Sequence, residues 1–369
     1  MEKKIALLPG SGIGAEVLAE ADKVLRSAAS RFGHRFEFIE AAGGDGAPLD
    51  AENLALCLSA DSVLAGVGTG VGIRQLIGEM RLQASMRPAL LYPQLAGASP
   101  LAPALVSRDI DLMLVQALTG GLAAERYGLA PADDGRAQDV LHCVESEAQR
   151  VASIAFRTAE LRRGGLVFVE QPGAPECNRL WRQVVQQTAA GFPRVAFSTL
   201  GASAAASQLL RDPARFDVIL ADGPCGEVLA GEAAGLTGSA GMMSCAMLSN
   251  GSKGLYHPVL GPSPDMAGQN LANPVGAVYA GALMLKYAFG MADECAAIEA
   301  AVQKVLDDGY RTVDILTPRC RLVSCDRFGD LIAAALTSPT LYRKVARSVK
   351  AAGEGFAPLH RKVTGAAEL

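Results

Sequence analysis

Short apolar runs alternate along the chain with longer segments whose apolar residues recur at helical spacing. The runs predict strands and the periodic segments predict helices. Strands are expected at 4–8, 36–41, 62–66, 110–115, 166–170, 194–197 and 218–220, and helices up to about 29 and at 139–163, 180–190, 204–210, 277–290, 293–308 and 331–336. This alternation predicts an α/β fold.

One strand-to-helix segment, Asp217–Gly241, stands out as the expected centre of the chemistry. Its apolar run Val218–Leu220 precedes a turn at Gly223 and Pro224, and a helical pattern follows from Gly226. Ligands of α/β proteins bind beyond the carboxyl ends of such strands.

Two glycine-rich segments could contact a ligand. Gly10, Gly12 and Gly14 lie in PGSGIGAE, but their spacing differs from the dinucleotide fingerprint, so a tight strand-to-helix turn is the favoured interpretation. The loop 66–75 could approach a ligand or be flexible. A projecting loop is expected at 120–136, and a solvated basic helix from Leu341 onward.

Composition excludes several classes of protein. The 369 residues carry a net charge of −4, so no basic surface for nucleic acid is expected. No apolar run is long enough for a membrane span, and the N-terminal sequence does not resemble a signal peptide. The eight cysteines form no C-x-x-C pair, which favours free thiols in the cytoplasm.

Five stretches carry a family resemblance. They read KIALLPGSGIGAEVLAEADKVL (4–25), RLWRQVV (179–185), LTGSAGM (236–242), PSPDMAGQNLANP (262–274) and AAIEAAVQKVLDDGYRTVD (296–314). The chain resembles the isopropylmalate and isocitrate dehydrogenase family, the metal-dependent β-decarboxylating dehydrogenases, and is closest to the isopropylmalate dehydrogenases.

The resemblance implies a two-domain α/β fold with a cleft between the domains. Residues 1–93 plus 242–369 would form the cofactor-side domain, and 94–241 the dimerisation and substrate-side domain. The family's members are dimers whose clefts borrow residues from the partner. They oxidise a 2-hydroxy acid with NAD or NADP and release the neighbouring carboxylate as carbon dioxide.

The family's metal site is incomplete in this sequence. The two helical aspartates of the family correspond to Glu227 and Gly231, and the partner's aspartate corresponds to Ser203. Asp222, Cys225 and His257 are the neighbouring residues that could replace them. With Glu227 as the one family carboxylate, bound Mg²⁺ or Mn²⁺ is not expected.

The family's proton-transfer residues are replaced. Gln171 corresponds to the lysine and Cys143 to the tyrosine, and no lysine occurs between Lys23 and Lys253. An amide has no titratable proton near neutral pH, so Gln171 cannot substitute for an ammonium group. Tyr127 is a further candidate, although a surface position is the favoured interpretation.

The carboxylate clamp retains one arginine. Arg87 matches a family arginine, whereas Gln116 and Ile77 replace the other two; Arg74 or Arg81 could stand in for the latter. Arg87 is equally well explained as a structural residue that bonds the carbonyls of its own loop.

The cofactor loop is partly preserved. Asp265 matches the family's acceptor of the NAD ribose hydroxyls, and Asn273 matches as well. Leu260 replaces a histidine, and Pro262 removes a backbone N–H. NAD is therefore a candidate ligand, and the alternative is that Asp265 and Asn273 merely hold the loop.

These losses predict a non-catalytic binding or regulatory subunit, as a homodimer or paired with an active relative. The alternative is a repurposed or divergent NAD-linked oxidoreductase or decarboxylase acting on a small 2-hydroxy acid. Its candidate groups are Arg87, Cys143, Gln171, Glu227 and His257, with Cys225 as a conceivable thiolate at a helix N-terminus. An ordinary dehydrogenase with compensating residues is the third hypothesis.

Overall fold

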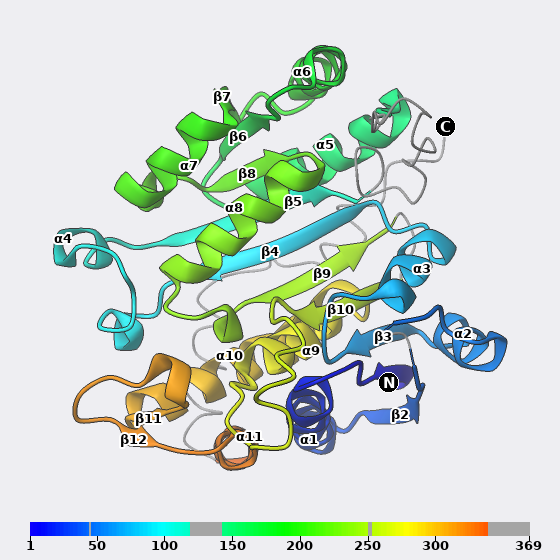
Figure 1. The fold of residues 1–369 in the computed structure, drawn as a ribbon, viewed down its shortest axis with the longest axis vertical. Helices are drawn as coiled ribbons and strands as arrows, with labels where there is room; N and C mark the ends of the chain where they lie inside the picture. Colours follow the sequence, from blue (N-terminus) through cyan, green and yellow to red (C-terminus); the bar gives the residue numbers. More distant parts are fainter. Residues whose placement is uncertain (44–45, 119–141, 250–252, 339–369) are drawn as a thin grey trace, which may run out of the picture. The chain divides into compact units, whose positions relative to one another are not determined.

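The computed structural model describes residues 1–43, 46–118, 142–249 and 253–338, which fold into two compact units (Figure 1). Unit 1 comprises Met1–Arg81, Leu91–Pro100 and the described residues from Thr237 onward, and unit 2 comprises Leu82–Leu90 and the described residues of Leu101–Leu236. The expected loop at 120–136, Tyr127 within it, and the expected basic tail lie outside the described residues.

The sheet of unit 1 has the strand order β2-β1-β3-β10-β9. Its strands are β1 (Glu2–Leu8), β2 (Arg35–Glu40), β3 (Ser62–Ala65), β9 (Ser244–Leu248) and β10 (Gly254–Pro258). The pairs from β2 to β10 are parallel and β9 is antiparallel to β10. A separate parallel pair joins β11 (Tyr310–Arg311) and β12 (Arg321–Leu322).

Helix α9 forms the centre of the core of unit 1. Its pattern is apolar all round, and every residue but Lys286 is buried, as expected for a helix surrounded by protein. It packs against α1, α10, β9 and β10. The helices of unit 1 are α1 (Gly14–Phe32), α2 (Ala51–Ser59), α3 (Val71–Glu79), α9 (Val275–Tyr287), α10 (Ala292–Asp307) and α11 (Cys325–Thr337), with 3-10 turns η1 (Pro93–Leu95), η4 (Ala240–Met242) and η5 (Val313–Ile315).

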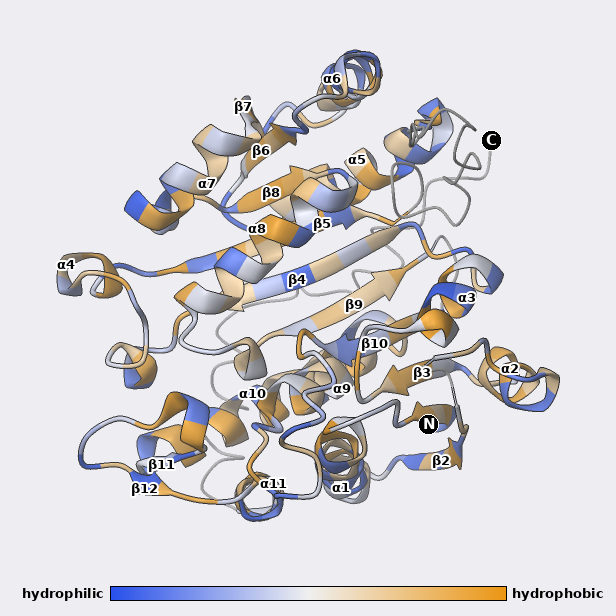
Figure 2. Cartoon of the chain, viewed as in Figure 1, coloured by the Kyte–Doolittle hydropathy of each residue, from blue (hydrophilic) through white to orange (hydrophobic). Residues whose placement is uncertain are grey.

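The sheet of unit 2 has the order β4-β5-β8-β6-β7. Its strands are β4 (Ala84–Leu90), β5 (Asp111–Ala117), β6 (Gly165–Glu170), β7 (Ala196–Gly201) and β8 (Val218–Ala221). All neighbours are parallel except β4, which is antiparallel to β5. Figure 2 shows the hydrophobic colouring of β6 and β8, which fits strands covered by helices.

Helices α5 and α8 cover the middle of this sheet. Helix α5 contacts β5, β6 and β8, and α8 contacts β4, β5 and β8. The helices of unit 2 are α4 (Pro103–Val106), α5 (Glu145–Glu160), α6 (Pro175–Ala189), α7 (Ala202–Arg211) and α8 (Gly223–Leu236), with the 3-10 turn η3 (Pro213–Arg215). None of the described helices is both long enough and apolar enough to span a membrane.

The first glycine-rich segment is a tight turn, as predicted. Gly12 has a φ of 59°, and a Cβ there would lie 1.7 Å from the Pro262 carbonyl oxygen. The Ile13 N–H donates to this same oxygen at 2.9 Å. These glycines therefore allow close backbone packing. The expectation for the loop 66–75 is wrong in its second half, since α3 begins at Val71.

Candidate active site

The carboxyl ends of β5, β8, β6 and β7 meet at one edge of the sheet of unit 2. Ala221 at the end of β8 pairs with Gln116 on one side and Val169 on the other, and Glu170 pairs with Gly201. Parallel strands thus bring several predicted site positions to one edge, where α/β proteins bind ligands.

Arg87 is buried and joins three elements. Its side chain is 5% exposed; Nη1 donates to Gln116 Oε1 at 2.8 Å, and Nη2 donates to Glu227 Oε2 at 2.9 Å. Gln116 Nε2 donates in turn to the Gly223 carbonyl at 2.8 Å. The arginine therefore bonds side chains of β5 and α8.

Gly226 makes room for this network. A Cβ at this position would lie 2.5 Å from Gln116 Cγ, closer than real Cβ contacts come. Gln116, which replaces a family arginine, thus packs directly on the first turn of α8. This helix begins at Gly223, three residues earlier than the predicted start.

Asp222 lies directly after β8 in a second buried cluster. It is 6% exposed, and it bonds the Trp181 side chain and the Gly223 backbone N–H. Cys143 Sγ donates to Asp222 Oδ2 at 3.9 Å, and Cys143 also bonds Cys177. Burial raises the pKa of Asp222 to about 6, against the opposing effect of these hydrogen bonds.

Cys143 and Cys225, which lie near Asp222, are not thiolates at neutral pH. Burial raises the pKa of Cys225 to about 11 and also raises the pKa of Cys143, with the nearby Asp222 carboxylate adding to both effects. The suggestion that a helix N-terminus makes Cys225 a thiolate is therefore wrong, because desolvation dominates.

Gln171 and Ser203 line one cavity of about 520 Å³ in unit 2. It is formed by the segments 170–175 and 201–204 with Asn178, at the ends of β6 and β7. Asn178 holds the backbone of Gln171 at both its N–H and its carbonyl. The positions of the family's lysine and partner aspartate therefore lie together, although neither side chain here is ionisable.

At the family's metal positions, Glu227 supplies a carboxylate whose side chain is 64% exposed. Gly231, four residues on, is exposed and has open space where a side chain would be. The described residues contain no group of three His, Cys, Asp or Glu side chains arranged for a metal. Mg²⁺ needs only one or two protein carboxylates when substrate and water oxygens complete its coordination, so Glu227 is compatible with such a site.

The two predicted cofactor residues lie in different environments of unit 1. Asp265 is exposed, whereas Asn273 is 3% exposed. The Asn273 amide donates to Asp314 at 3.0 Å, and its oxygen accepts from the Val275 N–H at the start of α9. The side chain of Asn273 therefore fixes the backbone at the start of α9, and the side chain of Asp265 lies at the surface.

The other candidate residues lie in unit 1. Arg74 and Arg81 are exposed there, and Arg81 has a positive φ of 52°. His257 is 3% exposed, and its ring packs where a Cβ on Gly68 would sit.

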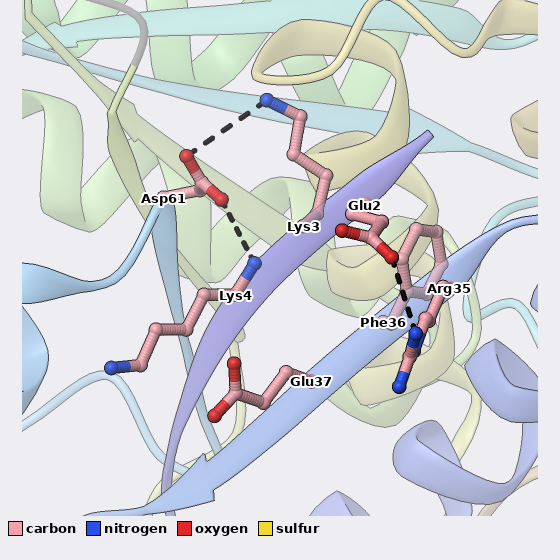
Figure 3. Close-up of a pocket in the computed structure, with 7 residues that line it drawn as sticks. All are labelled: Glu2, Lys3, Lys4, Arg35, Phe36, Glu37 and Asp61. Carbon is pink, nitrogen blue, oxygen red and sulfur yellow. Dashed lines mark hydrogen bonds and ion pairs between the residues drawn. The ribbon is translucent and has the colours of Figure 1, made fainter.

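A cavity of about 630 Å³ at the start of β1 and β2 has a different character (Figure 3). Lys3 pairs with Asp61 at 3.8 Å, and Arg35 pairs with Glu2 at 3.4 Å. It lies at the amino ends of parallel strands, opposite to the usual ligand edge. Its charges largely satisfy one another, so it is a weaker candidate site.

Three contributors were missed or undervalued at the sequence level. Trp181 was not considered, Gln116 was treated only as a lost arginine, and Asp222 only as a spare metal ligand. A signal for Asp222 existed, since an acid directly after a buried strand is unusual in a core position. No sequence pattern indicated that Trp181 would bond it.

The model of the isocitrate/isopropylmalate dehydrogenase family matches residues 4–332. The chain belongs to this family. A 3-isopropylmalate dehydrogenase of Xanthomonas euvesicatoria is 40% identical over 358 residues, covering 91% of this chain and 100% of that protein. One from Helicobacter hepaticus is 37% identical over 353 residues, covering 90% and 99%.

Solved structures of the family share the fold. The isocitrate dehydrogenase of Methylococcus capsulatus has a TM-score of 0.78 at 24% identity, covering 91% of this chain and 100% of that one. A beta-decarboxylating dehydrogenase of Thermococcus kodakarensis has a TM-score of 0.71 at 26% identity, covering 90% and 96%. The predicted α/β fold of this family is confirmed.

These relatives overturn two expectations. The prediction of a non-catalytic subunit is wrong, because proteins that are about 40% identical along their whole length are dehydrogenases. The expectation that Mg²⁺ or Mn²⁺ is absent is also wrong, because it conflicts with membership of a metal-dependent family. Both errors came from equating the loss of particular family side chains with the loss of the chemistry.

Proposed function

We propose that the protein is a divergent NAD-linked dehydrogenase that oxidises and decarboxylates a small 2-hydroxy acid. The observation that carries this proposal is the 40% identity to 3-isopropylmalate dehydrogenase over 91% of the chain. The buried Arg87, whose side chain bonds Gln116 near the carboxyl end of β5, supports it, because a 2-hydroxy acid with further carboxylates needs a fixed cation.

Arg87 would bind a substrate carboxylate. Glu227 is its exposed partner, and an exposed glutamate can rotate away at little cost, whereas Gln116 is buried and fixed. A substrate carboxylate would then take the position of Glu227 on Nη2, while Gln116 keeps the guanidinium plane in place. Exchange of one carboxylate for another leaves the buried cation paired throughout.

Glu227, released from Arg87, would hold a divalent cation together with substrate and water oxygens. A cation there polarises the substrate hydroxyl and stabilises the enolate that decarboxylation leaves. Gly231→Asp adds a carboxylate four residues from Glu227 on the same helical face, where space is open. It is expected to tighten Mg²⁺ binding in calorimetry, and Glu227→Gln to weaken it.

Unit 1 would bind the cofactor, and unit 2 the substrate. Asp265, which is exposed, would accept the ribose hydroxyls and repel the additional phosphate of NADP. We therefore propose NAD as the cofactor. Asp265→Asn is expected to reduce the preference for NAD over NADP in steady-state kinetics.

We further propose a homodimer in the cytoplasm. Leu210 of α7 and Val228 of α8 are 50% and 68% exposed, which fits helices that pair with another copy. All eight cysteines are free, which fits a reducing compartment. Sedimentation equilibrium would read the assembly; a species seen only with a related dehydrogenase present would favour pairing with an active relative.

The activity test uses the purified protein with NAD, Mg²⁺ and 3-isopropylmalate, isocitrate or malate. NADH and carbon dioxide are expected together from one of these acids. Arg87→Gln should lower kcat/KM about 10- to 100-fold, the effect of one charged hydrogen bond, while the exposed control Arg211→Gln should not. NAD binding without NADH from any acid would contradict the proposal.

A further inference from the structure

We propose that Asp222 is the proton-transfer group of this site, in place of the lysine and tyrosine that the sequence lacks. The inference rests on the proposed dehydrogenase function and names a catalytic residue for it. Three observations carry it, namely its place in the sheet, its neighbours, and the chemistry available nearby.

Asp222 lies next in sequence to the residues that hold Gln116, which bonds the proposed substrate-binding Arg87. It follows Ala221, the residue of β8 that pairs with Gln116, and the next residue's carbonyl accepts the Gln116 amide. Gln116 in turn holds Arg87 at 2.8 Å. The carboxylate and the substrate-binding arginine are therefore joined through one side chain and one peptide.

The surroundings of Asp222 hold no cation among the described residues. The groups that face it are Cys143 before α5, Cys177 and Trp181 of α6, and Cys225 of α8. Burial raises the pKa values of Cys143 and Cys225, so these thiols carry no charge near pH 7, and the Trp181 indole does not titrate. A buried acid without a counterion is costly, and such groups gather at functional sites.

Asp222 is the group of this cluster that exchanges a proton near neutral pH. Its pKa is raised to about 6 by burial, and general acid–base catalysis works best with a pKa close to the working pH. Neighbouring alternatives fail on chemistry, since Gln171 is an amide and no lysine lies between Lys23 and Lys253.

The steps balance with one proton. Ionised Asp222 accepts the proton of the substrate hydroxyl as the C–H bond gives its hydride to NAD and the C=O bond forms. The C–C bond to the leaving carboxylate then breaks, carbon dioxide departs, and its electron pair forms the enolate. Protonated Asp222 returns the proton, completing the keto product.

The decisive variant is Asp222→Asn, tested with Asp222→Glu and the exposed control Glu176→Gln. In the wild type, kcat/KM should fall as the pH drops through about 6, because the base becomes protonated. Asp222→Asn should lose this acid limb, with a rate about 10² to 10⁴-fold lower. Asp222→Glu should retain a limb and recover part of the rate, and Glu176→Gln should behave as wild type.

A half-reaction separates this proposal from the proposed function. The 2-keto acid formed by oxidation and decarboxylation of 3-isopropylmalate exchanges its α-hydrogens in D₂O if an enzyme base acts on it, which NMR records without hydride transfer. If the wild type catalyses this exchange and Asp222→Asn abolishes it, the role of Asp222 is supported. This holds even if no NADH forms, a result that would overturn only the dehydrogenase function.

Two results would overturn the role of Asp222. One is an Asp222→Asn enzyme that keeps the acid limb and a rate close to wild type. The other is a wild-type protein that supports neither NADH formation nor exchange. Circular dichroism checks whether Asp222→Asn is folded. If it is not folded, the pH profile and rate of Asp222→Glu provide the test.

Discussion

Strand β8 has an aspartate at each end, and both are buried. Asp217, at the amino end, is 4% exposed and accepts from Arg162 Nε at 2.8 Å and from the backbone N–H groups of Arg163 and Gly165. Asp222, at the carboxyl end, is 6% exposed and contacts Trp181, Cys143 and the Gly223 N–H. The two ends differ in charge compensation and not in burial.

This difference separates structural from chemical acids. Asp217 forms an ion pair with a guanidinium that Asp111 also binds at 2.9 Å, so a cation lies directly beside its carboxylate. Asp222 faces neutral donors, and desolvation holds its pKa near 6. An acid at the end of a strand can thus be held in an ion pair or left without a neighbouring cation, depending on which side chains the adjoining helices provide.

The largest expected change in the free energy of unfolding is at Asp217, at the amino end of β8. Asp217→Asn removes the charge that pairs with partly buried Arg162 and replaces one accepting oxygen with an N–H donor, which would face either the guanidinium or two backbone N–H groups. It is expected to lower the free energy of unfolding by about 3 to 5 kcal/mol, as breaking a buried ion pair does. Urea denaturation measures this free energy, and a loss below about 1 kcal/mol would contradict the structural role assigned to Asp217.

Asp222→Asn should raise the free energy of unfolding at neutral pH, whereas Asp217→Asn lowers it. The folded pKa of about 6 lies above the unfolded value near 3.8, so the unfolded chain binds fewer protons between these pH values. Stability of the wild type should therefore fall as the pH rises from about 4 to 6. Removing the charge should stabilise the fold at pH 7 by at most about 3 kcal/mol.

Thermal denaturation of wild type and Asp222→Asn across that pH range provides the measurement. The two curves should meet below pH 4 and separate above pH 6. Parallel curves would show that Asp222 is no costlier to ionise than an exposed acid. A gain in stability with a loss of activity would mark a residue kept for chemistry.

A smaller effect is expected at Gly226, beside the carboxyl end. Gly226→Ala places a Cβ 2.5 Å from Gln116 Cγ, and Gln116 is held by Arg87 and the Gly223 carbonyl. The overpacking should cost about 1 to 2 kcal/mol and raise KM for the hydroxy acid. The exposed control Gly231→Ala, which meets nothing within 4 Å, should be neutral or stabilising.

The smallest effect is expected from Trp181→Phe. The change removes a hydrogen bond that favours ionised Asp222, so the pKa of Asp222 should rise further, by at most about 1 pH unit. Infrared titration of the carboxyl band, with Asp222→Asn as the blank, would record the rise. An unchanged or lower pKa would contradict the assigned role of Trp181.

Periodicity was informative for elements whose burial is regular along the chain. The buried strands β3, β5 and β8 and the amphipathic helices α1, α7 and α10 lie close to their predicted ranges. Strand β4 was missed because Pro88 interrupts it, yet it pairs with β5 along its length. Strands β9 and β10 were missed, although the Asn250-Gly251 dipeptide between their two apolar runs is a hairpin signal in the sequence.

The candidate site was predictable in place but not in composition. The turn after β8 was identified from its strand–turn–helix pattern, and Arg87, Glu227, Gln171 and Ser203 all lie in unit 2. Judging each position against the family's residues led to the wrong inference of a non-catalytic protein. That comparison shows only whether the family's side chain is present at its own position. It cannot detect a different side chain that another helix or strand brings to the same site.

The amino-acid sequence by itself determined the α/β class, the family and the absence of lysine from the middle of the chain, because these depend on local pattern and residue identity. Only the tertiary structure decided which carboxylate is paired and which is not. A pKa depends on burial and on neighbours from distant segments. Asp217 meets Arg162 and Asp222 meets Trp181 only once helices and strands have packed.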